Sequence, residues 1–324
     1  MSPTEHVLAF DIGGTKLAAA VVDSDGEIAA EARTGTSGAD GESLYGQLES
    51  LGRSVVERSG NAISAVAAGC GGPMQFRSGV VSPLHIPQWR DFPLRDRLAR
   101  SFGVQAIVDN DAKAMAFGEW WRGAGRGTRN MLGMVVSTGV SGGLIIDGKL
   151  LDGEHGHAGH IGHVNVGPDG PACKCGARGC LAGVASGTGI ARRIAEAQHR
   201  GEPTGLKAGA TAEDAARAAR EGDALAARLF AEAAAGLGIG IASAVSLLDL
   251  DLVVIGGSIA IEAWDLIEGG LQTELRARAR SAFARDVRVT RASLGPRAGL
   301  IGAAAFALGL ESYPFTAPAV SPPT

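Results

Sequence analysis

The stretch that decides the fold is Asp11-Ile12-Gly13-Gly14-Thr15-Lys16, with apolar segments at 7–10 and 17–22 on either side of it. Apolar runs flanking paired glycines predict two short strands joined by a tight turn. Glycines expose backbone N–H groups and Thr15 adds a hydroxyl, so this turn suits phosphate oxygens. Asp11, at the strand end, could hold Mg²⁺ directly or through water. The alternative is an ordinary hairpin turn with an exposed Lys16.

Two further glycine-rich turns follow expected buried strands, Ser137–Gly143 after 131–136 and Gly256-Gly257-Ser258 after 252–255. Segment 131–146 repeats the strand, glycine turn, strand pattern of the N-terminus, which suggests two similar halves facing across a cleft. The three turns predict a nucleotide with its phosphates between the first two and its adenosine near the third. The first turn contains neither Gly-x-Gly-x-x-Gly nor Gly-x-x-x-x-Gly-Lys-Ser/Thr, which disfavours a dinucleotide-binding fold and a P-loop.

Asn110 and Asp111 follow an expected buried strand at 105–108, at the end where ligand groups gather in open α/β sheets. The carboxylate of Asp111 could accept a proton from an attacking hydroxyl while the amide of Asn110 orients a neighbouring one. The alternative is an N-cap for the helix that begins at Ala112.

The clearest metal signature is His163, Cys173, Cys175 and Cys180, one imidazole and three thiols suited to tetrahedral Zn²⁺. Four protein ligands leave no open position, so we expect a structural ion that holds the loop 153–182. The alternative is a cluster of free buried thiols. The histidines just before the cluster indicate a polar, ligand-facing loop.

Composition and charge disfavour nucleic-acid-binding, secreted and membrane proteins. The 324 residues carry a net charge of −4 with no block of like charges, which disfavours nucleic-acid and anionic-membrane partners. Segment 1–10 lacks the features of a signal peptide, so we expect a cytoplasmic protein. The most apolar stretch, 236–261, is interrupted by Asp249 and Asp251, and this pattern predicts a buried helix followed by a buried strand rather than a membrane span.

The order of elements predicts an α/β protein of two domains. A small domain is expected over 1–122 and a large domain over 123–297, with the glycine- and arginine-rich segment 123–127 at the boundary. A final helix near 298–311 is expected to pack back on the small domain, and 312–324 is expected to be disordered. Apolar periodicity predicts the other helices at 42–58, 94–102, 112–122, 190–198, 212–236 and 264–280.

In this order the motifs resemble the ROK family (repressors, open reading frames, kinases), over roughly residues 7–308. The matching segments are 11–16, Gly71-Gly72-Pro73, 82–89, 110–112, 137–143, 158–163, 173–181 and Gly256-Gly257. The resemblance implies an actin-like, ribonuclease H-like two-domain fold with a nucleotide and sugar cleft. It also implies ATP with catalytic Mg²⁺, and transfer of the γ-phosphoryl group to the 6-hydroxyl of a hexose. Members are commonly dimers or tetramers, so a homo-oligomer is expected.

The resemblance also assigns roles to residues. Asp111 matches the catalytic base, and the sugar is expected at Gly72, Asn110, Asp111, His160 and His163. ATP is expected at Asp11, Gly13, Gly14, Thr15, Lys16, Thr138, Gly139, Gly256 and Gly257. His163, Cys173, Cys175 and Cys180 match the zinc ligands, and His163 then lies at the sugar as well.

Four departures from the family pattern bear on the substrate. His160 and Ala182 replace two glutamates that bind hydroxyls near the anomeric end, while Ser141 replaces a glycine and Lys113 stands where asparagine is common. A carboxylate accepts two hydroxyl protons, a neutral histidine accepts one, and alanine accepts none. Because Asp111 and the phosphate turns are complete, a glucokinase-like enzyme for glucose or a similar hexose is the first hypothesis. A kinase for a modified sugar, C7-cyclitol or aminosugar is the second, and a catalytically silent sugar sensor the third. A repressor is disfavoured because only ten residues precede Asp11.

Overall fold

The computed structural model describes residues 5–308, so the expected tail at 312–324 lies outside the described part. Within it the chain forms two compact units. Unit 1 comprises 5–129, 143–158 and 293–308, and unit 2 comprises 130–142 and 159–292. The predicted domain bounds, 1–122 and 123–297, are not tested by this division and stay predictions.

The sheet of unit 1 has the strand order β3-β2-β1-β4-β7. β1 pairs antiparallel with β2 and parallel with β4, which pairs parallel with β7. This register aligns Ile12 with Cys70 and Cys70 with Asn110, so three strands end at one edge. The strands are β1 (His6–Ile12), β2 (Lys16–Asp23), β3 (Ile28–Gly35), β4 (Ala65–Cys70) and β7 (Gln105–Asn110), beside a small hairpin of β5 (Met74–Gln75) and β6 (Val80–Val81).

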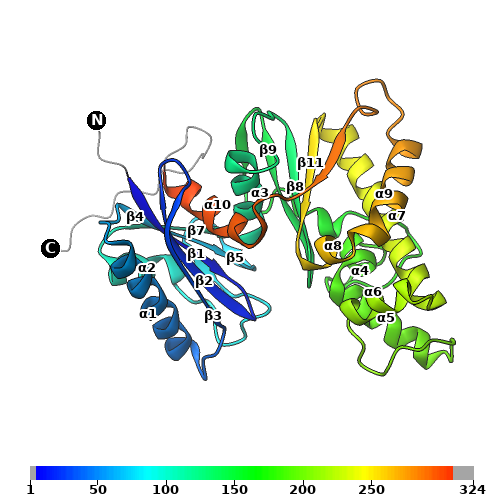
Figure 1. Cartoon of the computed structure of the whole chain (residues 1–324), viewed down its shortest axis with the longest axis horizontal. Helices are drawn as coiled ribbons and strands as arrows, with labels where there is room; N and C mark the ends of the chain where they lie inside the picture. Colours follow the sequence, from blue (N-terminus) through cyan, green and yellow to red (C-terminus); the bar gives the residue numbers. More distant parts are fainter. Residues whose placement is uncertain (1–4, 309–324) are drawn as a thin grey trace. The chain divides into compact units, whose positions relative to one another are not determined.

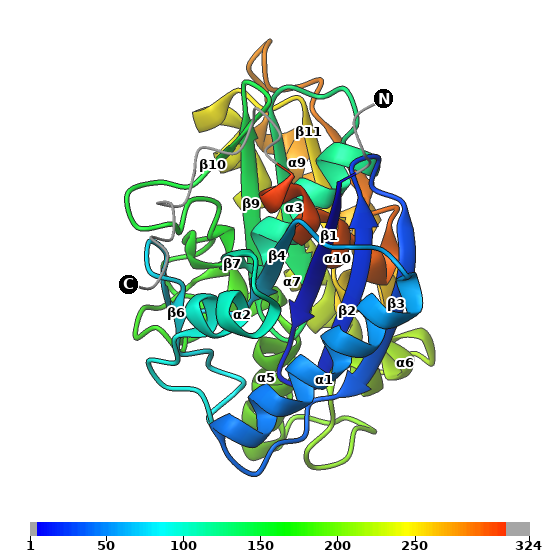
Figure 2. The same cartoon turned by 90° about the vertical axis from the view of Figure 1, so that its left-hand side faces the viewer.

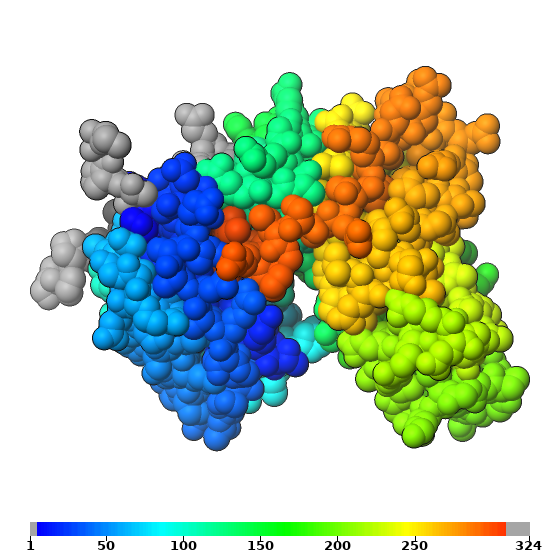
Figure 3. All heavy atoms as spheres, in the orientation of Figure 1, coloured from blue at the N-terminus to red at the C-terminus, as the bar shows by residue number. Residues whose placement is uncertain are grey.

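Helices cover both faces of this sheet. α1 (Gly41–Ser59) and α2 (Leu94–Phe102) pack on the face that Leu8 and Phe10 line, and they lie toward the viewer in Figure 2. α3 (Asp111–Arg122) and α10 (Ala298–Ala307), which follows the 3-10 turn η2 (Gly295–Arg297), pack together and against β1 and β4. Figure 3 shows α10, in orange-red, beside the blue N-terminal strands.

The second sheet has the strand order β10-β9-β8-β11-β12. Its strands are β8 (Met131–Val136), β9 (Val140–Ile146), β10 (Lys149–Leu151), β11 (Leu252–Gly256) and β12 (Arg288–Arg291). The helices of unit 2 are α4 (Leu181–Ala185), α5 (Gly187–His199), α6 (Ala212–Arg220), α7 (Ala224–Leu248), α8 (Ser258–Glu262) and α9 (Trp264–Arg278), with the 3-10 turn η1 at Ile161–His163. Figure 1 shows α7 and α9 side by side.

The predicted single helix at 212–236 is wrong, because the chain breaks between α6 and α7. Gly222 adopts a φ of 93°, which ends α6, and the carboxylate of Asp223 accepts the N–H of Ala226 and caps α7. By length and composition α7 could cross a membrane, but it packs against α4, α6 and α9 as a core helix does. α7 followed by β11 confirms the predicted buried helix and strand.

Glu119, on α3, joins two distant segments of unit 1. Its side chain is fully buried and accepts the N–H of Ala124 at 2.9 Å and that of Leu294 at 2.8 Å. The N–H and hydroxyl of Ser293 both donate to the same carboxylate at 3.1 Å. Four donors therefore share the buried carboxylate of Glu119. The donors lie close to where the chain leaves unit 1 after Arg129 and where it returns at Ser293.

We expect Glu119→Gln to lower the free energy of unfolding by roughly 3–5 kcal/mol, because the amide loses the charge and presents N–H groups to other donors. Urea unfolding measures this loss. Glu49→Gln is the control, because Glu49 forms an exposed pair with Arg53 that contributes at most about 1 kcal/mol. Equal losses in the two variants would contradict the argument.

Candidate active site

Asp111 begins α3 at the edge where β1, β4 and β7 end. Its Oδ1 accepts the N–H of Ala112 at 2.9 Å, and a side chain at Gly71 would lie 3.7 Å from its Oδ2. The glycine turn after β4 therefore leaves one carboxylate oxygen of Asp111 approachable. The structure thus places Asp111 and the turn containing Gly72 side by side, and their role in binding a sugar stays a prediction.

Asn110 ends β7 and caps α3. Its Oδ1 accepts the N–H of Ala112 at 3.0 Å and that of Lys113 at 3.4 Å, so the N-cap interpretation is confirmed. Capping occupies the oxygen and fixes the side chain, which leaves the amide NH₂ as the group that could donate to a sugar hydroxyl. The sugar-binding role of Asn110 is compatible with the cap and stays a prediction.

Burial raises the pKa of both acidic side chains at this edge. The pKa of Asp11 rises to about 6, mainly because burial disfavours its charged form, with the nearby Asp111 as a second cause. Burial likewise raises the pKa of Asp111, although hydrogen bonds from backbone N–H groups and the charge of His85 oppose the shift. A divalent cation near Asp11 would fit this edge, because the ion would relieve the repulsion between the two carboxylates.

This environment predicts a pH-dependent stability. Since folding raises the pKa of Asp11 from 3.8 to about 6, the folded state binds the proton more tightly and loses stability as pH rises through that range. Asp11→Asn should therefore stabilise the protein at pH 7 by roughly 1–3 kcal/mol, and by less near pH 4. Chemical unfolding at several pH values, with the exposed Asp25→Asn as control, measures the difference. A gain that is independent of pH would show that the buried charge of Asp11 is not its cause.

The first glycine turn joins β1 to β2 in unit 1. The N–H of Gly13 donates to the carbonyl of Lys16 at 3.0 Å, while Thr15 and Lys16 are exposed. A side chain at Gly14 would lie 2.5 Å from the Cβ of His85, so only glycine fits beside that loop. The turn is compact, with an exposed hydroxyl and ammonium at its tip, and its phosphate-binding role stays a prediction.

The second and third glycine turns lie together in unit 2. Ser137 Oγ is 3.0 Å from Ser258 Oγ, and Gly257 has a φ of 96° that lets the chain pass the backbone of Val136. A pocket of about 270 Å³ opens beside them, and Thr138 and Ser258 form part of its wall. The expected position of the adenosine near Gly256-Gly257, next to Ser258 of this pocket, stays a prediction.

Several residues of this pocket were not predicted from the sequence. Thr188, at the start of α5, donates its hydroxyl to the carbonyl of Thr138 at 2.9 Å, and Glu213 lies in the first turn of α6. The Ser186–Gly189 segment, a helix start with two glycines, was the signal that could have indicated the first of them. The remaining unpredicted wall residues are Gly187, Ala191, Gly209, Ala210, Thr211, Ala212 and Ile259.

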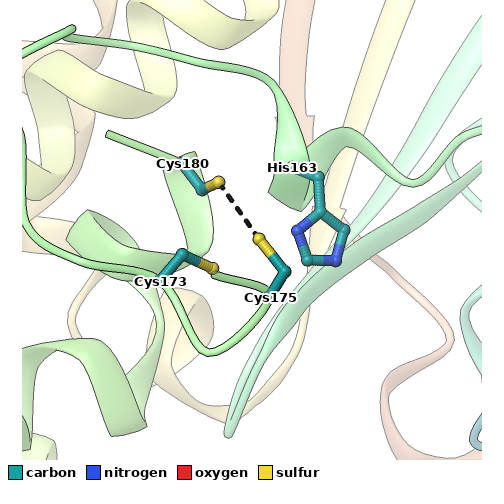
Figure 4. A group of neighbouring side chains, drawn as sticks. All are labelled: His163, Cys173, Cys175 and Cys180. Carbon is teal, nitrogen blue, oxygen red and sulfur yellow. Dashed lines mark hydrogen bonds between the residues drawn. The ribbon is translucent and has the colours of Figure 1, made fainter. Parts of the chain in front are cut away.

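The four predicted zinc ligands come together in unit 2, as Figure 4 shows. One ligating atom from each of the four residues lies within 4.8 Å of the others. Cys175 Sγ and Cys180 Sγ are 3.7 Å apart, close to the about 3.8 Å that separates two thiolates bound tetrahedrally to Zn²⁺. Cys175 is exposed, which disfavours the alternative of buried free thiols. The residues present therefore fit a structural zinc ion.

The local chain geometry prepares these ligands. Gly176, with a φ of 95°, closes a turn in which the N–H of Cys173 donates to the carbonyl of Ala177 at 2.7 Å. Backbone hydrogen bonding at Ala177 lowers the pKa of Cys175 to about 7, whereas burial raises the pKa of Cys180 to about 12. Zinc binding would thus release a proton from Cys180, because the ligand is the thiolate.

The residues of the expected sugar wall in unit 2 adjoin this cluster in sequence. His160 stacks on His163 with ring centroids 6.2 Å apart, and His163 belongs to the zinc group. Ala182 is the second residue of α4, directly after Cys180 and Leu181, and its carbonyl accepts the N–H of Ser186. A zinc ion would therefore fix the orientation of His163 and the start of α4 together.

Comparison with known proteins identifies the family. The sequence model of the ROK family matches residues 7–309. The chain belongs to the ROK family. A glucokinase of Halalkalibacterium halodurans is 36% identical over 306 residues, covering 91% of this chain and 92% of the relative. An N-acetylmannosamine kinase of Yersinia pseudotuberculosis is 34% identical over 301 residues, covering 93% and 97%.

A solved ROK structure extends the likeness to the fold. The crystal structure of a ROK family glucokinase from Streptomyces griseus, in complex with glucose and AMPPNP, superposes with a TM-score of 0.75 at 33% identity. The match covers 93% of this chain and 98% of that one. The predicted α/β, actin-like ATPase fold is confirmed, and the ROK relatives support a sugar kinase.

Proposed function

We propose that this protein transfers the γ-phosphoryl group of ATP to the primary 6-hydroxyl of glucose or a glucose-like hexose, with Asp111 as the general base. The observation that carries the proposal is the position of Asp111. It is a half-buried carboxylate with a raised pKa, at the edge where three strands end and beside the glycine turn 71–72 and the fixed amide of Asn110. The glucokinase relatives, one of them solved with glucose and AMPPNP, support the same chemistry.

In the proposed reaction Asp111 accepts the proton of the sugar hydroxyl as the hydroxyl oxygen attacks the γ-phosphorus. The new O–P bond forms while the bond to the β,γ-bridging oxygen breaks, and ADP leaves with the electron pair. The raised pKa of Asp111 favours proton acceptance near neutral pH. Asn110 would orient the sugar, and the glycine turns at 13–16 and 138–139 would bind phosphate oxygens.

Two metal ions belong to the proposal in different roles. Mg²⁺, held near Asp11 and the phosphates, would neutralise the charge that develops during transfer. Zn²⁺ at His163, Cys173, Cys175 and Cys180 would be structural, because the four ligands fill its tetrahedral shell. Neither Asp11 nor the cysteines would exchange a proton with the sugar in this scheme.

The experiment that tests the proposal is a panel of acceptors assayed for ADP release with ATP and Mg²⁺. The panel contains glucose, mannose, N-acetylmannosamine, an aminosugar and a C7-cyclitol. We expect glucose or a similar hexose to give the highest kcat/KM. Turnover of the cyclitol or aminosugar alone would favour the second hypothesis. Sugar binding by calorimetry without turnover of any acceptor would identify a silent sensor and refute the kinase.

The substituted sugar wall makes a prediction about selectivity. His160 and Ala182 remove two carboxylates that the family uses near the anomeric end, and a hydrogen bond to a charged group contributes about 1.5–3 kcal/mol. If glucose binds there, His160→Glu/Ala182→Glu should lower the KM for glucose about 10- to 100-fold with a smaller change in kcat. Steady-state kinetics of the double variant measure this, and an unchanged KM would contradict the proposed role.

Partners and location follow from the same proposal. A small-molecule sugar and ATP are the proposed partners, without nucleic acid or membrane. A cytoplasmic homo-oligomer, a dimer or tetramer, remains our prediction, and light scattering on the purified protein would test the oligomeric state.

A further inference from the structure

A buried lysine lies two residues after the proposed base. Lys113, in the first turn of α3, is 1% exposed, and its ammonium donates to Asp109 Oδ2 at 2.6 Å and forms an ion pair with Asp152. The ring of Phe76 lies 4.7 Å from the ammonium. Asp109 is fully buried and Asp152 nearly so, and all four residues belong to unit 1. A buried ammonium is tolerated here because two carboxylates compensate it.

One side of this cluster reaches the catalytic turn. Asp109 holds Lys113 with one oxygen, and its other oxygen accepts the N–H of Asn110 at 2.6 Å. The side chain of Asn110 in turn caps α3 through the N–H groups of Ala112 and Lys113. Hydrogen bonds thus run without interruption from the lysine to the residue beside Asp111.

The other side reaches a loop that is 39 residues further along the chain. Asp152 follows β10 and begins the loop 152–158, which is closed by a hydrogen bond from the N–H of Ala158 to the carbonyl of Asp152 at 2.9 Å. The chain then continues directly into Gly159 and His160, where the sugar is expected. Lys113 therefore joins the catalytic turn to the segment that leads into the sugar wall.

The geometry favours a positioning role over simple stabilisation. A buried ion pair contributes little net stability compared with apolar residues of the same size, because desolvation opposes the attraction between the charges. Its charge-assisted hydrogen bonds nevertheless fix the partners in one arrangement. The ammonium of Lys113 binds two carboxylates of unit 1. Lys113 would therefore act on the acceptor site through these neighbours.

We propose that Lys113 and Asp152 are positioning residues of the acceptor site. The bond to Asp109 fixes the Asn110–Asp111 turn, and the bond to Asp152 fixes the loop 152–158 ahead of His160. This inference rests on the proposed kinase function. It adds that the contact of Lys113 with Asp152 governs the affinity for the sugar. The contact of Lys113 with Asp109 governs the rate of phosphoryl transfer.

Asp152→Asn is the decisive variant, because Lys113 keeps Asp109 and the side-chain shape is preserved. The matched control is Glu154→Gln, in the same loop, whose partner Arg77 is exposed. Hydrogen exchange of the protein alone should show faster exchange over 153–158 in Asp152→Asn and not in the control. In the kinase assay Asp152→Asn should raise the sugar KM about tenfold and change kcat less than about threefold, with the KM for ATP unchanged.

Asp109→Asn tests the other side of the cluster, and we expect kcat to fall at least about tenfold with a smaller change in sugar KM. Faster loop exchange with an unchanged sugar KM in Asp152→Asn would show a merely structural contact and overturn the proposal. The proposal would also be overturned if Asp152→Asn had the same loop exchange and the same sugar KM as Glu154→Gln. A wild type that phosphorylates no sugar would instead refute the proposed function, while the exchange experiment would still show whether Asp152 holds the loop.

Discussion

Asp111→Asn is expected to lower kcat about 10²- to 10⁴-fold, the usual contribution of a general base. The amide has nearly the same shape as the carboxyl group, and its oxygen can still accept the N–H of Ala112, but it cannot take the hydroxyl proton. Because burial raises the pKa of Asp111, folding works against its charged form. The variant should therefore unfold at the same temperature as the wild type or at a higher one.

Turnover by coupled ADP release and melting by calorimetry measure the two effects together. Loss of activity with a lower melting temperature would indicate misfolding and not a missing base. Full activity in the variant would contradict the assignment of Asp111. Sugar affinity in the absence of ATP should fall much less than kcat, since the amide oxygen still accepts a hydrogen bond and Asn110 keeps its cap in this variant.

Loss of a zinc ligand is expected to have the largest effect on stability. Structural zinc sites contribute about 10–16 kcal/mol of apparent binding free energy at neutral pH. Cys180→Ser should reduce the zinc content from one ion per chain to a small fraction and lower the melting temperature. It should also open the loop 153–182 to proteases, because the ion is expected to hold that loop. Elemental analysis and calorimetry measure the first two effects.

Cys70→Ala is the matched control for zinc content, because Cys70 is a free, buried thiol outside the cluster. This variant should keep one zinc ion per chain. A strong chelator should lower the melting temperature of the wild type and leave that of Cys180→Ser unchanged. Wild-type protein that is free of zinc and equally stable would refute the structural ion.

Local sequence patterns predicted most of the fold and part of the site. The paired glycines at 13–14 and the apolar runs beside them predicted β1 and β2, and the register then aligned Ile12, Cys70 and Asn110. The spacing of His163 and the three cysteines predicted the metal cluster. These signals are local, since turn conformation and ligand spacing are properties of short segments.

The parts that the sequence did not predict depend on contacts between distant residues. Lys113 meets Asp152 39 residues away, and Glu119 accepts donors from Ser293 and Leu294 more than 170 residues away. No spacing rule links such positions, because tertiary packing alone brings them together. The sequence did not predict the break between α6 and α7 for a local reason. The alanine-rich pattern continues on both sides of Gly222, but the positive φ of Gly222 ends the helix.

The most direct test of the central claim is the identity of the product. ³¹P NMR of the reaction of wild-type protein with ATP, Mg²⁺ and glucose should show ADP and a phosphomonoester coupled to the two protons on carbon 6. The same reaction with Asp111→Asn should show almost none of it. A phosphoester at another carbon would contradict the proposed position of transfer. Absence of any sugar phosphate, with glucose and with the rest of the panel, would contradict the kinase itself.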